Sequence, residues 1–160
     1  MKSRARHESR VLAVQFLFQR DFNRDEFSGA LERFWDGHKG GPGVRLFSDE
    51  LIAGVEAHRE TLDDRIRDLA ENWDVHRMGA VDRAILRVAL FEILYREDIP
   101  PIVSVNEAVE LAKEFSGVES GRFVNGILDR SVREAARPAR CAKPEPRFQR
   151  APPRGPREER

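Results

Sequence analysis

Apolar residues recur every three or four positions along most of the first 136 residues, which is the spacing of amphipathic helices. No stretch alternates apolar and polar residues for long, and Asn125-Gly126 falls inside a helical pattern rather than between two strands. The pattern therefore predicts an all-α, single-domain bundle of about seven helices. We expect these helices over residues 4–22, 25–35, 45–58, 60–73, 79–96, 104–115 and 120–136.

The fifth predicted helix is the most apolar and has apolar residues on two faces, which indicates a central position. Glu92 falls on one of these faces, in line with Val81, Ile85 and Val88. A buried carboxylate can act as a general acid. More often it is held by an arginine or by a helix N-terminus, and we favour this structural interpretation of Glu92.

Glycine, proline and capping residues mark boundaries along the chain. Four glycines and Pro42 over residues 37–43 predict a loop, and Pro100-Pro101 should end the fifth helix. Ser104 stands three residues before Glu107, which predicts a capping box at the start of the sixth helix. Six prolines and many arginines then predict a disordered tail over residues 138–160, behind a folded domain over residues 1–137.

The formal net charge of zero conceals a separation of charge along the chain. Residues 1–24 carry six basic and two acidic side chains, and residues 137–160 carry eight basic and three acidic ones. The middle of the chain is correspondingly acidic. Basic ends on an acidic body are typical of a protein that binds nucleic acid at one surface and a basic partner at another, although solvated surfaces are charged in any protein.

No apolar run approaches the roughly 18 to 20 residues of a membrane helix. The basic start followed by apolar residues 11–18 is superficially like a signal peptide, but Gln15 interrupts it and no small-residue cleavage site follows. The single cysteine, Cys141, excludes an internal disulfide bond. We therefore expect a cytoplasmic protein.

Motifs of catalysis and metal binding are missing from the sequence. The glycine-rich segment is not followed by the Gly-Lys-Ser/Thr of a phosphate-binding loop, the four histidines are scattered, and there is no Cys-x-x-Cys or Gly-x-Ser-x-Gly. We therefore expect a protein that is not an enzyme and that has no metal or cofactor.

Two groups of residues are candidates for RNA binding. Arg6 and Arg10 are four residues apart on the first helix, and basic residues precede them. Arg122-Phe123 lies in the first turn of the last helix, where arginine can pair with phosphate and phenylalanine can stack on an unpaired base. The alternatives are a solvated basic terminus for the first group and core packing for Phe123.

At these residues the chain resembles the NusB family of bacterial transcription antitermination factors. The resemblance covers roughly residues 4–136, and its last two motifs are highly specific in combination. The motifs are Arg10-Val-Leu-Ala-Val-Gln-Phe-Leu-Phe18, Val81-Asp-Arg-Ala-Ile-Leu-Arg-Val-Ala-Leu-Phe-Glu92, Ile99-Pro100, Asn106-Glu-Ala-Val-Glu-Leu-Ala-Lys113 and Phe123-Val-Asn-Gly-Ile-Leu-Asp129.

The resemblance implies a NusB-like helical fold that binds the boxA segment of ribosomal RNA leader transcripts. It also implies a protein partner, the small-subunit ribosomal protein NusE, and a role in helping RNA polymerase resist termination. Carried over, the partner-binding residues are Asp82 and Phe18, which stands where the family usually has tyrosine. The RNA contacts carried over are Arg6, Arg10, Arg122 and Phe123, and the acidic Glu119 lies beside that site. The basic residues Lys2 and Arg4 at the start of the chain complete the predicted RNA-binding set.

Two other classes of function remain open at this stage. A similar helical domain precedes the catalytic domain of some ribosomal RNA cytosine methyltransferases, but no catalytic domain follows here. The chain could also be a helical module that binds only proteins. Salt-dependent binding to single-stranded boxA-like RNA would separate that module from an antitermination factor.

Overall fold

The computed structural model describes residues 3–71 and 78–136, and within these ranges it contains seven helices and no strand. The all-α prediction and the order of the helices are confirmed. None of the described helices is long and apolar enough to span a membrane. The helices are α1 (Ser3–Phe22), α2 (Phe27–Gly37), α3 (Pro42–Ala57), α4 (Arg59–Leu69), α5 (Ala80–Tyr95), α6 (Pro101–Phe115) and α7 (Val118–Ala136).

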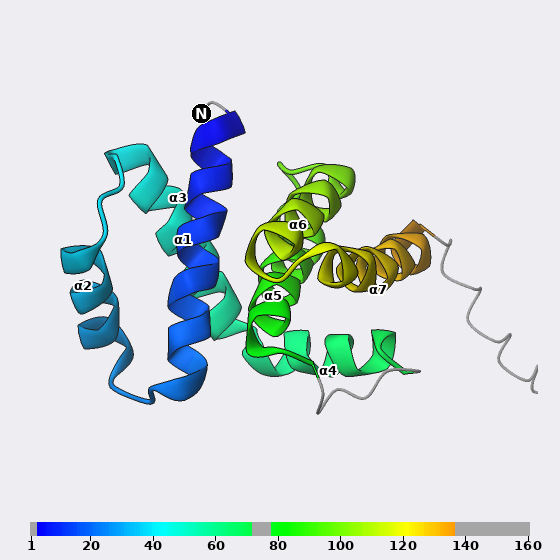
Figure 1. Ribbon diagram of the computed structural model, residues 1–160, viewed down its shortest axis with the longest axis horizontal. Helices are drawn as coiled ribbons and strands as arrows, with labels where there is room; N and C mark the ends of the chain where they lie inside the picture. The colour runs from blue at the N-terminus through cyan, green and yellow to red at the C-terminus, as the bar shows by residue number, and fades with distance from the viewer. Residues whose placement is uncertain (1–2, 72–77, 137–160) are drawn as a thin grey trace, which may run out of the picture.

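Helix α5 lies in the middle of the bundle, as its two apolar faces predict. It packs against α1 and α3 on one side and against α6 and α7 on the other, while α4 crosses beneath it (Figure 1). Every residue from Ala84 to Glu92 is buried. Helix α2 lies at the outer edge beyond α1, and α6 and α7 pack against each other and are joined at Gly117.

The capping box predicted at Ser104 is wrong. Helix α6 begins one turn earlier, at Pro101, where the fixed φ of proline suits the first helical position. Ser104 is consequently inside the helix and buried, and its hydroxyl donates a hydrogen bond to Glu92 at 3.3 Å. Proline at N1 also starts α3 at Pro42, so the predicted loop over residues 37–43 is shorter than expected. Trp73 and the tail over residues 138–160 lie outside the described residues.

Gly54 allows α3 and α5 to approach closely. A Cβ atom at this position would overlap the ring of Phe91 on α5. The neighbouring residues Leu51, Ile52 and Val55 are fully buried. The contact between α3 and α5 is therefore tightly packed around Gly54, and α1 packs against both of these helices.

Candidate nucleic-acid interface

The N-terminal end of α1 presents fewer free cations than the sequence predicts. Arg4 is exposed and makes no ion pair or hydrogen bond to the described residues, whereas Lys2 lies outside them. Arg6 is partly exposed, and its guanidinium lies 4.9 Å from the centroid of the Phe47 ring and 3.8 Å from Asp98. The Arg6 side chain therefore remains partly accessible to a ligand.

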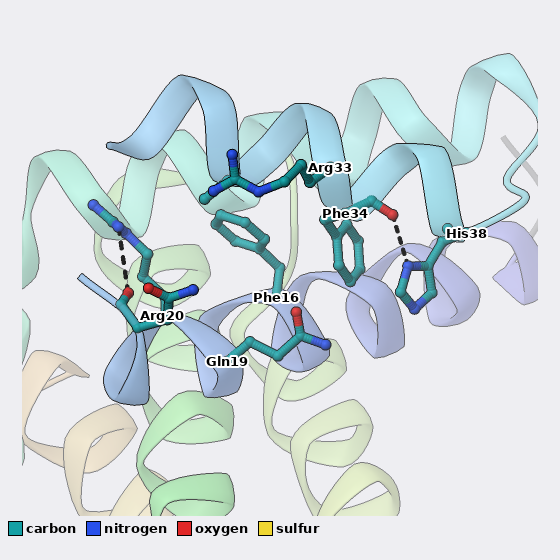
Figure 2. Close-up of a pocket in the computed structure, with 9 residues that line it drawn as sticks. Phe16, Gln19, Arg20, Arg33, Phe34 and His38 are labelled. Carbon is teal, nitrogen blue, oxygen red and sulfur yellow. Dashed lines mark hydrogen bonds between the residues drawn. The ribbon is translucent and has the colours of Figure 1, made fainter. Parts of the chain in front are cut away.

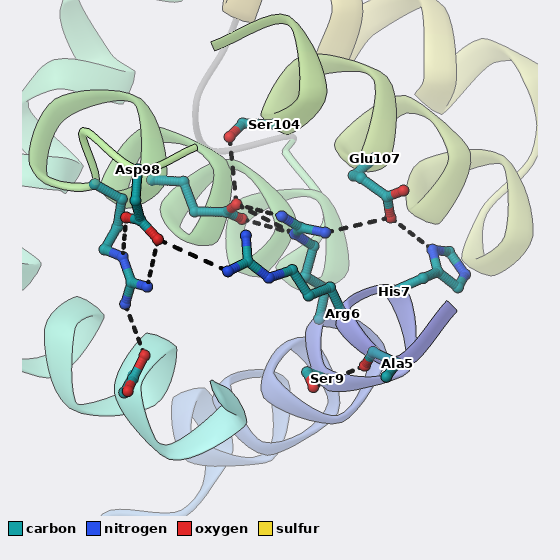
Figure 3. Close-up of polar contacts among 11 residues, drawn as sticks. Ala5, Arg6, His7, Ser9, Asp98, Ser104 and Glu107 are labelled. Atoms are coloured by element: carbon teal, nitrogen blue, oxygen red, sulfur yellow. Dashed lines mark hydrogen bonds and ion pairs between the residues drawn. The ribbon is translucent and has the colours of Figure 1, made fainter. Parts of the chain in front are cut away.

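The prediction that Arg10 is a surface arginine available to RNA is wrong, because only 2% of Arg10 is exposed. Its Nε and Nη2 atoms donate to both carboxylate oxygens of Glu92, the shortest contact being 2.7 Å (Figure 3). Glu92 is 1% exposed and also accepts from Ser104. In this arrangement Arg10 cannot reach a phosphate in solvent, and the structural interpretation of Glu92 is confirmed.

His7 joins the same end of α1 to α6. Its Nδ1 atom lies 2.7 Å from Glu107 (Figure 3), and its Nε2 atom lies 3.4 Å from Glu114. Arg10 Nη1 is 3.8 Å from the same Glu107 carboxylate. Because α7 begins at Val118, four residues after Glu114, this contact brings the basic end of α1 towards the start of α7.

The first turns of α7 hold the second group of predicted RNA-binding residues. Glu119 and Arg122 are both exposed, and the Arg122 guanidinium makes no ion pair or hydrogen bond within the described part of the chain. Phe123 is partly buried and packs against the core cluster. The core-packing interpretation of Phe123 is therefore partly correct. Only part of the ring remains accessible for stacking on a base.

A groove with several polar residues in its lining runs between α6 and α7, and Arg122 forms part of it. It has a volume of about 630 Å³, and its lining includes Asn106, Val109 and Lys113 from α6 and Gly121, Arg122 and Asn125 from α7. Gly121 is buried, and a Cβ atom there would lie 2.9 Å from Lys113 Cγ. The missing side chain at Gly121 therefore lets the aliphatic part of the Lys113 side chain pack against the backbone of α7.

The residues predicted to bind a protein partner lie where the end of α1 meets the start of α5. Phe18 is partly buried and packs edge-on against Phe22, which is 72% exposed at the last position of α1.

Asp82, at the start of α5, accepts a hydrogen bond from Ser120 at 3.0 Å. Burial raises the pKa of Asp82, and the Ser120 hydrogen bond only partly opposes this rise. Asp21 lies 3.9 Å from Arg83, next to Asp82, and so links the two helix ends.

A second crevice lies between α1 and α2, far along α1 from its basic end. Figure 2 shows the rings of Phe16 and Phe34 forming its apolar wall, with Gln19, Arg33 and His38 around it. His38 Nδ1 donates to the Phe34 carbonyl oxygen at 2.7 Å. The crevice has a volume of about 200 Å³, which is smaller than the volume of the α6–α7 groove. Its Arg33 is already paired with Asp25 at 2.9 Å.

Sequence patterns could suggest part of this interface and not the rest. The arginines of α1 look alike in a helical pattern, and only the position of Glu92 on an apolar stripe hinted that one of them is buried. The groove depends on residues from two helices, Asn106 and Asn125 among them, and no spacing within one helix reveals it. The exposure of Phe22 could have been suspected from its place at the helix end.

Comparisons with known proteins agree with this architecture. The model of the NusB family matches residues 7–133. A transcription antitermination protein NusB from Heliobacterium modesticaldum is 45% identical over 130 residues, which is 81% of this chain and 63% of that protein's length. The chain thus spans less than two thirds of that relative.

Solved structures give the same result. NusB of T. maritima is 37% identical with a TM-score of 0.71, covering 81% of this chain and 91% of that one. A crystal structure of the antitermination factors NusB and NusE in complex with double-stranded RNA contains a chain of the same fold. That chain is 21% identical with a TM-score of 0.72, and the match covers 83% of this chain and 99% of that one.

Proposed function

Because this chain belongs to the NusB family, we propose that it is a transcription antitermination factor that binds single-stranded boxA RNA of ribosomal RNA leaders. It binds this RNA together with NusE, in the bacterial cytoplasm, and the complex helps RNA polymerase resist termination. The observation that carries the RNA-binding role is the free guanidinium of Arg122. Among the described arginines only Arg4, Arg24 and Arg122 lack an ion pair or hydrogen bond.

The proposed RNA surface begins at the N-terminal end of α1 and continues to the start of α7. Arg4, Arg6 and Arg122 contact phosphates, with Lys2 adding charge. Glu119 accepts hydrogen bonds from base amino groups, and the accessible part of Phe123 stacks on a base. Arg10 has a different role, since its buried pair with Glu92 positions α1 against α5.

The proposed partner surface combines Asp82 with the aromatic pair Phe18 and Phe22. A carboxylate near one exposed and one partly buried aromatic ring suits a partner that is basic and presents some apolar surface. Phe18 cannot supply the hydroxyl of the family's usual tyrosine, so its contribution is apolar contact. The exposed ring of Phe22 adds to the same contact.

One binding assay with two ligands tests the proposal. The chain should bind single-stranded boxA RNA more weakly as salt rises, and it should bind NusE separately. Asp82→Arg should weaken NusE binding and spare RNA binding, whereas Glu32→Arg, the same charge change at an exposed position on α2, should affect neither. Binding to NusE without any binding to RNA would leave a protein-binding module and overturn the antitermination role.

Phe123 needs a conservative variant because its ring packs against the core. Phe123→Leu keeps apolar volume and removes the aromatic face, so RNA binding should weaken by about 1–3 kcal/mol with little change in its salt dependence. Unfolding by denaturant serves as the control for packing. RNA affinity equal to that of the unmodified protein would remove Phe123 from the RNA surface.

A further inference from the structure

We propose that the groove between α6 and α7 is a base-recognition pocket for a nucleotide of single-stranded RNA next to the one held by Arg122. The inference rests on the proposed RNA-binding function and extends it to residues outside the predicted site. It places base recognition on Asn106 of α6 and Asn125 of α7, two amides that line the same groove as Arg122.

The first support is the state of the two asparagine side chains. Both are exposed, and neither side chain makes a hydrogen bond to any described residue. An asparagine amide has two donors and an acceptor, so it can pair with the edge of a base that also offers donors and acceptors. Two such amides facing one hollow can recognise a base without breaking any internal contact of the protein.

The second support is the distribution of charge around the groove. Arg122 stands at one side with a guanidinium that has no partner in the described ranges, and Lys113 lies on α6 with its Nζ 3.6 Å from Glu110. These two cations can hold the phosphates on either side of a nucleotide. The Glu110 carboxylate also lines the groove, where it repels phosphate but accepts hydrogen bonds from the amino groups of bases. The groove thus separates places for phosphate from a place for a base edge.

The third support is shape. Val109 and Val118 give the groove apolar walls, and Gly121 lets the aliphatic part of Lys113 lie against α7 beside them. A single unpaired base has two apolar faces and a polar edge, which matches apolar walls beside amide groups. A base inside a duplex has its pairing edge occupied, so the groove should favour single-stranded RNA.

The test compares Asn106→Ala, Asn125→Ala and Gln19→Ala in binding to labelled single-stranded boxA RNA and to the duplex of the same sequence. Gln19 is an exposed amide in the α1–α2 crevice and serves as the matched control (Figure 2). Each groove variant should weaken single-strand binding by about 3- to 10-fold, the effect of one or two lost hydrogen bonds. Duplex binding, and all binding by Gln19→Ala, should change less than about two-fold.

Nuclear magnetic resonance provides a readout that does not depend on the variants. The side-chain amide signals of Asn106 and Asn125 should shift when the single-stranded RNA is added, while that of Gln19 should not. If the protein binds the RNA and these signals and affinities do not change, the groove inference is wrong and the proposed function stands. If Arg122→Ala and the unmodified protein both fail to bind single-stranded RNA, the proposed function and the groove inference fail together.

Discussion

Arg10 and Arg122 look equivalent in the sequence, yet the structure gives them opposite surroundings. Arg10 is 2% exposed and bound through two nitrogen atoms to Glu92, whereas Arg122 is exposed and unpaired within the described residues. The first stabilises the junction of α1, α5 and α6, and the second is available to a ligand. The difference teaches that the role of an arginine here follows from its partner and not from its place in a basic motif.

The largest expected effect comes from breaking the buried pair. Arg10→Ala should lower the free energy of unfolding by about 3–5 kcal/mol, because it leaves Glu92 buried without its cation. Denaturant unfolding measures this loss. The double variant Arg10→Met/Glu92→Leu should recover most of the stability, since no uncompensated charge remains. A stability equal to that of the unmodified protein for Arg10→Ala alone would contradict the buried pair.

A matched pair of glycine variants separates the packed side of the bundle from the open one. Gly54→Ala should cost about 1–3 kcal/mol, because the added methyl group overlaps the Phe91 ring. Gly126→Ala on α7 meets nothing within 4 Å and should stabilise the protein by up to about 1 kcal/mol. Thermal or denaturant unfolding of both variants checks the signs. Two variants of the same sign would mean that the two regions do not differ in packing as described.

The smallest effect concerns pH and separates two aspartates. Hydrogen bonding from Arg96 lowers the pKa of Asp98, so its contribution is present above the ordinary pKa of 3.8 and is lost as the pH falls through the lowered value. This contribution should stay below about 1 kcal/mol, because the pair is exposed. Burial raises the pKa of Asp82, so its ionisation opposes folding at neutral pH and acid relieves that cost.

Two variants, Asp98→Asn and Asp82→Asn, measure these contributions when their free energies of unfolding are compared at acidic and neutral pH. Asp98→Asn should flatten the loss of stability in acid. Asp82→Asn should instead raise the stability at neutral pH slightly, since the amide oxygen can still accept from Ser120. The same pH response from both variants would show that one of the two directions is wrong.

The sequence was sufficient for the fold because helical periodicity and proline or glycine boundaries are local signals. It placed α5 at the centre correctly from its two apolar faces, and it missed the start of α6 because Ser104 fits a capping box but is inside the helix. The site was less predictable. Whether Arg10 is buried or Arg122 is free depends on residues 82 positions away or on other helices, and helical spacing does not contain that information.

The central claim is that Arg122 meets the RNA phosphate backbone, and the salt dependence of RNA binding tests it most directly. Arg122→Ala should reduce the slope of log affinity against log salt by roughly 0.7 for single-stranded boxA RNA. Its free energy of unfolding should stay within about 0.5 kcal/mol of the unmodified protein. Arg133→Ala, an exposed arginine on α7 paired with Asp129 at 3.0 Å, is the matched control and should leave the slope unchanged. An unchanged slope for Arg122→Ala, or an equal reduction for Arg133→Ala, would contradict the claim.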